Sequence, residues 1–511
     1  MKMIKNLIAI FGFILCVFVT MLNIIYIANV SNTWQEVVTF NKIGFIESLL
    51  IAIIVFLTII ISKFINKISL KFNENKIKIC VGVVLITYAL LSIMWIFYID
   101  SYPIADSLRV YEAACELYDK EPISHQQYFE LYPQNLTLAY VFSKIFIILH
   151  SKNIIILKII NIIANCFTIL GLCKIQGILE KKYQANKSLL VILSFSYIPI
   201  MILVNFIYGD LISLPLTLFS VYYLMKYIDT NRILNIIISS MFMMMSITLR
   251  MNNLIFVIAS IFYLILNLGL VREEKISTRG YIKKILLIIL FVTISILPYI
   301  ALKNILVKRY ALDPTKSFPV IGFIAMGMEE GERANGWYKE DTASIGFTDI
   351  DNSQERYREI IYRRIDDFKD DFLYGVIFYI KKVASMWTDP LQESIWQSLS
   401  FNTDSDFLRN KTEEEREEYK KHDIFLINNQ IIIKIYEKSV LIIIFGGTTF
   451  FILKNRKNVS NEIVFLLLCF IGGMMFHILW EAKSRYIISY ILVLIPIASL
   501  EINRKKEEKE F

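Results

Sequence analysis

The sequence predicts an all-α polytopic membrane protein with about twelve transmembrane helices, juxtamembrane helices on the outer face and one larger outer loop domain. The chain has 511 residues, of which 56% are hydrophobic, and its mean hydropathy is +0.54. A bilayer core requires about 20 apolar residues per helix, and runs of this length recur along the chain. The runs are continuously apolar, whereas the strands of a membrane barrel alternate apolar and polar residues. The spanning elements are therefore helices.

The first apolar run follows a short basic start and reads LIAIFGFILCVFVTMLNIIYI. It is longer than the apolar core of a cleavable signal peptide and lacks a small-residue cleavage site, so we expect a retained anchor. Segment 136–150 is apolar but short, contains Lys144, and either crosses the bilayer or dips into its outer leaflet. The predicted spans are 4–28, 45–63, 79–99, 153–173, 189–207, 211–228, 233–249, 254–271, 284–303, 432–453, 462–480 and 486–502.

The distribution of lysine and arginine predicts the orientation, because short basic loops remain on the cytoplasmic side. All the basic segments reach one side only if segment 136–150 does not cross. Both termini are then cytoplasmic, and loops 100–152 and 304–431 lie outside with the turns near 208, 250 and 481–485. The basic segments are 63–78, 174–187, 272–284, 454–457 and the tail from Arg504.

This layout divides the chain into an N-terminal transmembrane hairpin, a transmembrane core, a large extracytoplasmic loop, and C-terminal transmembrane helices with a cytoplasmic tail. The core includes a first outer loop, 100–152, that we expect to be catalytic. The four parts are 1–78, 79–303, 304–431 and 432–511.

Two local patterns predict further structure. In the large loop, Asn352 and Glu355 have the spacing of a capping box, and apolar residues from Tyr357 to Phe372 recur on one helical face. In the span 432–453, Lys434 and Glu437 lie one turn apart and are expected to form a local ion pair.

The composition argues against several classes of partner. The net charge of +8 arises largely in short loops, so it reports orientation and not nucleic-acid binding. The six cysteines and four histidines have no paired ligand spacing, so we expect no disulfide framework, no metal site and no other cofactor.

Polar residues gather at the predicted outer ends of the helices, although such residues are costly near a bilayer unless they have a function. Together they predict a cavity at the outer membrane surface that bears both carboxylates and cations. Arginine and lysine there can hold the phosphate of a lipid-linked substrate, and a carboxylate can accept a proton from an attacking hydroxyl. The candidates are Asp106, Arg109, Tyr111, Tyr132, Asn135, Tyr208, Asp210, Arg250, Asn252, Glu481, Lys483 and Arg485.

Three stretches resemble the C-type membrane glycosyltransferases, the class that contains protein O-mannosyltransferases and aminoarabinose transferases. ADSLRVYEAA is similar to the Asp-Glu-x-Arg-Tyr start of their first outer loop, with Asp106 and Arg109 matching and Ser107 replacing the second acid. YFELYPQNLTLAYVFSKIF has Tyr-Pro-Gln in place of the double-proline turn. WEAKSRYIISYILVLIP resembles their late Glu-x-x-x-Arg-Tyr segment.

The resemblance implies transfer of a sugar from a polyprenyl-phosphate donor in the bilayer to an extracytoplasmic acceptor, which is a glycopolymer, a glycolipid or a protein. Asp106 would be the catalytic base, and Arg250, Lys483 and Arg485 would bind the donor phosphate. The remaining candidates would contact substrate. A single carboxylate suffices for inverting displacement, and the absence of an acid at position 107 disfavours a bound divalent metal.

Other interpretations remain open for these residues. Asp106 and Asp210 could each cap the helix that follows, and Arg250 could extend to lipid headgroups. Glu481 lies one helical turn from Arg485 and could form a structural ion pair with it.

A lipid-linked saccharide flippase or polysaccharide exporter without bond chemistry is the alternative function. A transporter would be expected to show paired half-sequences with polar breaks at matching depths, and the sequence shows no such pairing.

Overall fold

The computed structural model describes residues 2–31, 36–99, 101–267, 278–348, 350–399, 411–456 and 459–504. Within these ranges the regular structure is helical apart from four short strands, which confirms the predicted all-α polytopic class. Part of the basic segment 272–284 and the tail beyond Arg504 lie outside the described residues.

Seven helices in the described part of the chain are long and apolar enough to cross a membrane. An eighth span is formed if α8 (Lys187–Ser196) is counted with the segment that follows it, α9 (Ile198–Ile202) and η1 (Leu203–Asn205), across a bend of 46°. The seven are α1 (Lys2–Ile25), α2 (Phe45–Ser69), α3 (Glu74–Tyr98), α7 (Ile154–Leu179), α10 (Gly209–Thr230), α13 (Thr278–Arg309) and α20 (Asn461–Leu479).

The predicted number of twelve spans is not confirmed. Two apolar helices are short, α11 (Ile233–Leu249) with 17 residues and α12 (Leu254–Asn267) with 14, the latter preceded by η2 (Met251–Asn253). The last predicted span, 486–502, is broken into η6 (Ser484–Ile487), α21 (Ile488–Leu492) and α22 (Ile495–Ala498). Pro496 lies in this broken region, and a proline removes a backbone donor.

The C-terminal half contains a helix longer than predicted, α19 (Glu413–Asn455), with 43 residues. The charged stretch before the predicted span is helical because Thr412 and Glu415 form a capping box at its start. Ion pairs such as Glu417–Lys420, at 2.6 Å, support its exposed first turns.

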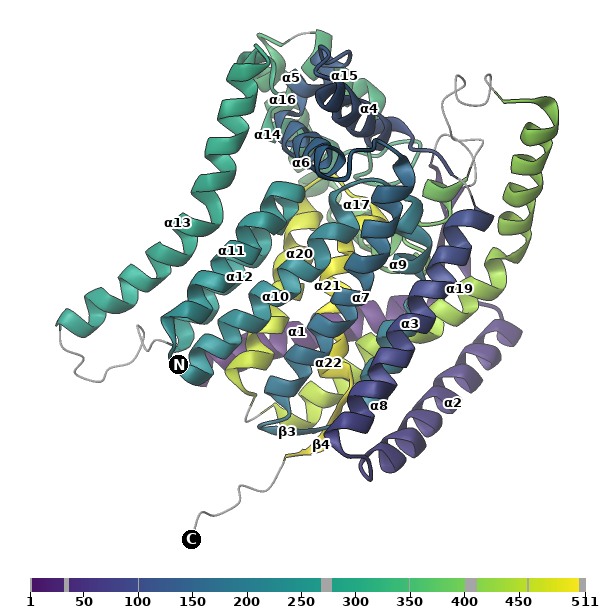
Figure 1. Ribbon diagram of the computed structural model, residues 1–511, viewed down its shortest axis with the longest axis vertical. Coiled ribbons are helices and arrows are strands. Elements are labelled where there is room, and N and C mark those ends of the chain that lie inside the picture. The colour runs from purple at the N-terminus through teal and green to yellow at the C-terminus, as the bar shows by residue number, and fades with distance from the viewer. Residues whose placement is uncertain are drawn as a thin grey trace.

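Shorter helices gather at the upper end of the bundle (Figure 1). The predicted helix of the large loop is confirmed as α16, although Phe372 begins the next helix, α17 (Phe372–Trp387). The helices at this end are α4 (Ala105–Asp119), α5 (Gln126–Leu131), α6 (Pro133–Leu149), α14 (Val320–Met328), α15 (Glu340–Thr348) and α16 (Ser353–Asp370). The short turn η3 (Pro314–Lys316) follows α13, and η4 (Trp396–Ser398) follows α17.

The described residues contain two small antiparallel pairs. β1 (Tyr26–Val30) and β2 (Val38–Lys42) form a hairpin after α1, and β3 (Tyr183–Ala185) pairs with β4 (Leu500–Arg504). The β3–β4 pair lies at the lower end, beside the connection from α2 to α3 (Figure 1).

The basic segments 63–78 and 174–187 therefore lie at the same end. Asn186 Nδ2 donates to Ser62 Oγ at 3.1 Å, which joins them directly. This arrangement requires that α6 does not cross the bundle, as the charge distribution predicts, and α6 lies instead with α4 at the upper end.

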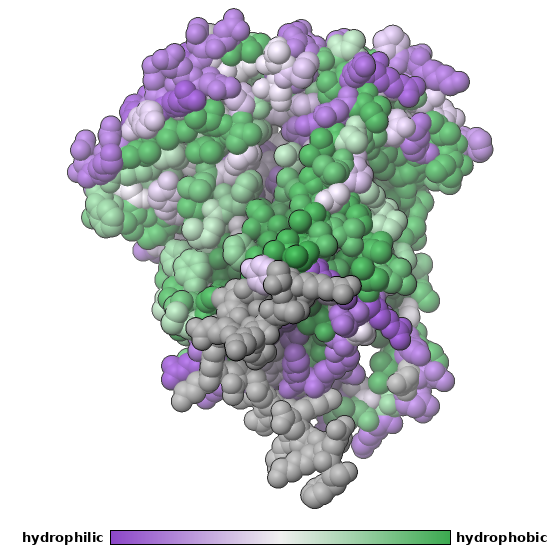
Figure 2. Space-filling view, turned by 90° about the vertical axis from the view of Figure 1, so that its left-hand side faces the viewer, coloured by the Kyte–Doolittle hydropathy of each residue, from purple (hydrophilic) through white to green (hydrophobic). Residues whose placement is uncertain are grey.

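The surface is divided in the way expected of a membrane protein. Figure 2 shows a broad apolar band between a polar upper end and polar patches at the lower end. Helix α2 contributes strongly to lipid-facing surface, since only 11% of its most apolar window is buried.

Candidate functional site

The first part of the site is formed where the start of α10 meets the end of α11. Gly209 makes this contact possible, because a Cβ atom there would lie 2.0 Å from the carbonyl oxygen of Leu249. The close approach places Asp210, in the first turn of α10, against Arg250, which follows α11, and the two side chains form an ion pair. The side chains of Arg250 and Asp210 are only 12% and 6% exposed. Arg250 therefore points inward to Asp210, and the interpretation that it extends to lipid headgroups is wrong.

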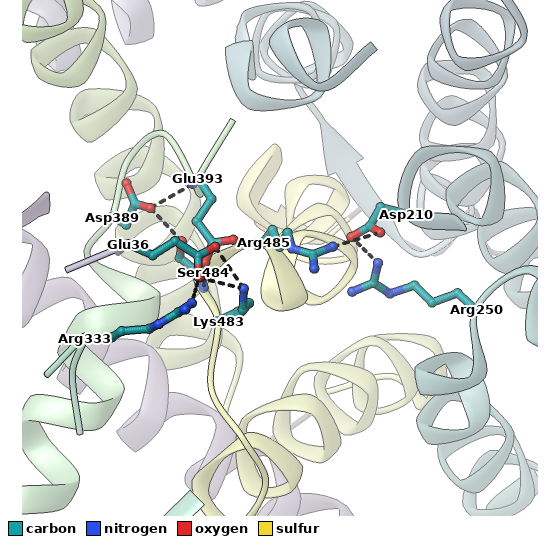
Figure 3. A network of polar contacts seen from close by, with 9 residues as sticks. All are labelled: Glu36, Asp210, Arg250, Arg333, Asp389, Glu393, Lys483, Ser484 and Arg485. Atoms are coloured by element: carbon teal, nitrogen blue, oxygen red, sulfur yellow. Dashed lines mark hydrogen bonds and ion pairs between the residues drawn. The ribbon is translucent and has the colours of Figure 1, made fainter. Parts of the chain in front are cut away.

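Arg485 joins this pair to a second group of charges (Figure 3). Its Nη1 donates to Asp210 Oδ2 at 3.3 Å, and its Nε lies 3.3 Å from Glu393 Oε2. Its guanidinium also lies 4.8 Å from the ring centroid of Phe206. Burial lowers the pKa of Arg485, but Asp210, Glu393 and the neighbouring tyrosines together outweigh it and the net shift is upward. Arg485 is therefore a permanently charged bridge.

The β1–β2 hairpin supplies a further acid, Glu36. Lys483 Nζ donates to both carboxylate oxygens of Glu36, at 2.9 and 3.0 Å, and Arg333 forms an ion pair with the same group. Burial alone would raise the pKa of Glu36, but Lys483 and Arg333 outweigh it and the pKa is lowered. Glu36 is thus a buried anion that holds two cations in place.

The segment after α17 contributes Asp389 and Glu393. Asp389 accepts hydrogen bonds from the amide of Glu393 at 3.0 Å and from Ser484 Oγ at 2.6 Å. The amide of Ser484 donates to Glu393 Oε1 at 3.2 Å. Burial raises the pKa of Glu393 to about 7 against the opposing effect of Lys483. This segment therefore holds the turn that carries Lys483 and Arg485.

Backbone strain is concentrated near these groups. Glu36, Gln392 and Glu393 have φ values of 52°, 48° and 59°, and Ala105, beside Asp106, has 47°. Non-glycine residues rarely adopt this left-handed region, and such residues persist where the surrounding structure imposes them, often at functional sites.

Glu481 lies in the same turn as Lys483 and Arg485. It is 7% exposed, and within the described residues its carboxylate makes no ion pair or side-chain hydrogen bond. Burial raises the pKa of Glu481, the cation Lys483 opposes the rise, and the nearby charge of Asp106 adds to it. A raised pKa makes this carboxyl group easier to protonate than an exposed glutamate.

Lys382 of α17 positions the chain on which Glu481 lies. Its buried ammonium donates to the carbonyl oxygens of Ile478 and Trp480, at 2.9 and 2.8 Å, and to that of Gly327. All three donors of the ammonium are used in holding the end of α20 against α17 and α14.

Asp106 is the most exposed of the site carboxylates, with 49% of its side chain accessible. It lies in the first turn of α4 and 4.0 Å from Arg109. Ile104 occupies the cap position, and Ser107 makes the two hydrogen bonds there, so Asp106 does not cap the helix. Its charge acts on both Glu481 and Tyr208, which places it at the outer boundary of the site.

Predicted tyrosine and asparagine residues connect α4, α6 and α10. Asn135 Nδ2 donates to the hydroxyl of Tyr128 at 2.6 Å, and Tyr208 donates to Asn135 Oδ1 at 3.0 Å. Tyr132 packs in an aromatic group with Phe318, and the charge of Asp106 acts on it. Arg109 lies over the ring of Tyr128 at 4.9 Å.

Two predicted site residues are not brought to the network. The hydroxyl of Tyr111 donates to the carbonyl oxygen of Lys152 at 3.0 Å, and its ring contacts Phe146 on the side of α4 that faces α6. Asn252 is half-buried beside Arg250, but its side chain has no hydrogen bond to another described residue, whereas the adjacent Asn253 donates to Ser246.

The predicted helical pair of Glu481 and Arg485 is wrong. The backbone at Trp480 and Lys483 is extended, with ψ values of 164° and 145°, so the helical spacing does not apply. Arg485 pairs with Asp210 and Glu393 instead.

Five residues of the network were not predicted from the sequence: Glu36, Arg333, Asp389, Glu393 and Ser484. A usable signal exists for two of them, because Asp389 and Glu393 are the acids in WTDPLQESIWQSL, a stretch without basic residues. Glu36 and Arg333 are 297 residues apart, and no local pattern indicates their contact.

Comparisons with known proteins give one family and a distant structural similarity. The profile of a family described as "conserved hypothetical integral membrane protein" matches residues 1–506. No curated protein sequence matches the chain. Among solved structures, the chain is similar to the archaeal oligosaccharyltransferase AglB from Archaeoglobus fulgidus, in complex with an inhibitory peptide and a dolichol-phosphate.

That similarity has 12% sequence identity and a TM-score of 0.40, and it covers 83% of this chain and 50% of AglB. The chain thus spans about half the length of the oligosaccharyltransferase. A TM-score this low supports no inference about the ligands or activity of the present chain.

Proposed function

We propose that this chain, which belongs to the family of conserved hypothetical integral membrane proteins, is a membrane glycosyltransferase. It transfers a sugar from a polyprenyl-phosphate donor in the bilayer to an acceptor on the extracytoplasmic side, which is a glycopolymer, a glycolipid or a protein.

The observation that carries the proposal is the pair of arginines on Asp210. Arg250 and Arg485 each place Nη1 on Asp210, and Nη2 of both guanidinium groups makes no hydrogen bond or ion pair within the described residues. Guanidinium groups bind phosphate oxygens in a bidentate manner, and burial strengthens the interaction. Two partly unused guanidinium groups side by side are suited to the phosphate of a lipid-linked donor.

In the proposed reaction the acceptor hydroxyl attacks the anomeric carbon of the donor sugar. The bond between that carbon and the phosphate oxygen breaks, and polyprenyl phosphate leaves with the electron pair. Arg250 and Arg485 neutralise the charge that develops on the leaving phosphate, and Lys483 adds a positive charge beside them. The configuration at the anomeric carbon is inverted because a single displacement occurs.

Asp106 accepts the proton of the attacking hydroxyl in this scheme. Its exposure leaves it accessible to an acceptor from the aqueous side, and it remains close enough to Glu481 for their charges to interact. Glu481, a buried carboxyl group without a side-chain partner in the described residues, forms a hydrogen bond with the bound substrate in this scheme.

The test is a transfer assay with the purified full-length chain in lipid nanodiscs. A panel of polyprenyl-phosphate sugars, labelled in the sugar, is mixed with cell-envelope acceptors, and release of free polyprenyl phosphate is measured. Asp106→Asn should reduce the rate by a factor of about 100 or more, which is typical for loss of a general base. Addition of EDTA should leave the rate unchanged, because the arginines supply the positive charge.

Asp119→Asn is the matched control, since Asp119 is an acid on the same helix that pairs with Lys152 away from the network. It should retain the full rate. Movement of labelled lipid across the bilayer without bond cleavage would refute the enzyme and favour the flippase. A fully active Asp106→Asn variant would remove the proposed base.

A further inference from the structure

A second polar pocket lies between the β1–β2 hairpin and α19. Its volume is about 350 Å³. The polar residues on its wall are Asn29, Ser31, Thr39 and Asn41 of the hairpin, Glu47 at the start of α2, and Gln430 and Lys434 of α19.

Lys434 is the unusual member of this wall. It is only 6% exposed, and it makes no hydrogen bond or ion pair with any residue in the described ranges. The predicted pair with Glu437 is wrong, because Glu437 instead accepts from the amide of Ile198 at 2.9 Å, where α8 breaks into α9. One turn further, Lys438 donates to the carbonyl oxygen of Thr388 at 2.7 Å, so only one of these two buried lysines has a protein partner.

The stem of Lys434 is buried and its ammonium is not fully enclosed, so the pocket is the place where a partner for the ammonium can enter. The side-chain amides of Asn29, Asn41 and Gln430 also make no side-chain hydrogen bond within the described part of the chain. One cation and three amides can together donate several hydrogen bonds to a single anion.

The acids around Lys434 are already engaged or lie further away. Glu47 Oε2 accepts from the amide of Gly44 at 2.8 Å as part of the capping box of α2. Asp389 is close enough for its charge to act on Lys434, but it forms no ion pair with it and accepts from Ser484 and two amides. Lys434 therefore remains available to an anion from outside the chain.

The surroundings of the pocket indicate where this anion comes from. Phe45 and Ile46, next to Glu47, are 84% and 72% exposed, and they begin a helix whose surface is apolar along its length. Ile431 of α19, on the wall of the pocket, is exposed as well. A ligand with a phosphate group and acyl chains can satisfy the pocket and this apolar surface at once.

We infer that the pocket binds the phosphate group of a bilayer phospholipid, through Lys434 and the three amides. This lipid site is separate from the proposed donor site at Arg250 and Arg485, and it does not depend on the sugar transfer. The hairpin between them presents Glu36 to one site and Asn29 and Asn41 to the other.

Native mass spectrometry of the full-length protein in detergent tests this inference. The wild-type protein and Lys434→Met are titrated with short-chain phosphatidylglycerol, and in a second arm with inorganic phosphate. The wild type should bind one lipid about tenfold more tightly than the variant, as expected for loss of one charge-assisted contact. Lys454→Met is the matched control, because this lysine is exposed near the other end of α19, and it should bind as the wild type does.

Asn41→Ala keeps the test decisive if Lys434→Met does not fold, since Asn41 is exposed on the hairpin and its loss should weaken lipid binding about threefold. Equal lipid binding by the wild type and the folded pocket variants would overturn the inference. Inorganic phosphate binding as tightly as the lipid would overturn the assignment to a phospholipid.

Discussion

Asp210 is shared by Arg250 and Arg485, and all three side chains are buried or nearly so. Removing one partner from a buried ion pair is more costly than the pair itself is stabilising, because the remaining charge is left without compensation. At the scale of the residue, stability and the proposed activity therefore depend on the same carboxylate.

Asp210→Asn should lower the free energy of unfolding by about 3 kcal/mol or more, since two buried guanidinium groups lose their shared anion. Asp106→Asn, at a side chain that is half exposed, should change it by less than about 0.5 kcal/mol. Unfolding midpoints of both purified variants in detergent measure the difference. Equal shifts would show that the Asp210 network does not stabilise the fold.

The pH dependence of stability should contain a contribution from Glu393. Its pKa is raised in the folded protein to about 7, from 4.5, by burial. Between these values the folded protein binds a proton that the unfolded chain does not, so stability falls as the pH rises. Glu393→Gln should flatten this decline between about pH 5 and pH 8, measured as the unfolding midpoint against pH.

In Glu393→Gln the decline of the unfolding midpoint with pH should become less steep without vanishing. The pKa of Glu481 is also raised, so its titration lowers stability as the pH rises too. The lowered pKa of Glu36 has the opposite effect, since it makes stability rise with pH. This rise is confined to pH values below the ordinary pKa of 4.5. A variant with an unchanged slope would contradict the assigned protonation of Glu393.

At the scale of the element, the contact between α10 and α11 determines where the charges lie. Gly209→Ala should destabilise the protein by about 1–3 kcal/mol, because its Cβ would overlap the Leu249 carbonyl oxygen and force the two helices apart. The rate of sugar transfer should fall as well, because Asp210 moves away from Arg250. Gly177→Ala in α7 is the control: no atom lies within 4 Å of its added Cβ, and it should be neutral or stabilising by up to about 1 kcal/mol.

The contact between α17 and the end of α20 depends on a single lysine. Lys382→Met should destabilise the protein by about 2–3 kcal/mol, because buried carbonyl oxygens lose their donor. The neighbouring Lys381 is exposed, and Lys381→Met should leave the thermal midpoint almost unchanged. Similar midpoints for the two variants would mean that these carbonyl groups find other donors.

At the scale of the whole molecule, the apolar band separates an end that carries the charged network from an end that carries the basic connections (Figures 1 and 2). We expect the network to face the outside, because short basic loops remain cytoplasmic. In a background without native cysteines, Asp119→Cys should react with a membrane-impermeant thiol reagent on intact cells. Lys67→Cys, in the basic connection, should react only after permeabilisation, and the reverse pattern would invert the proposed orientation.

Much of the architecture could be predicted from local patterns. The apolar runs predicted α2, α3, α7 and α20 within a few residues, and the charge distribution predicted that α6 does not cross. The count of twelve spans is not confirmed, because α11 and α12 are short, the segment from η6 to α22 is broken, and the predicted span 432–453 in α19 is not among the seven.

For the candidate site, the sequence predicts several of the residues but not which of them contact each other. The sequence by itself determined the membrane class, the end at which the polar residues gather and the presence of Asp210, Arg250, Glu481 and Arg485 there, because run length and charge distribution are properties of neighbouring residues. Only the tertiary structure decided that Arg485 pairs with Asp210 and Glu393 and that Lys434 faces a pocket alone. Such pairings depend on how segments hundreds of residues apart pack against each other, and no local pattern records that packing.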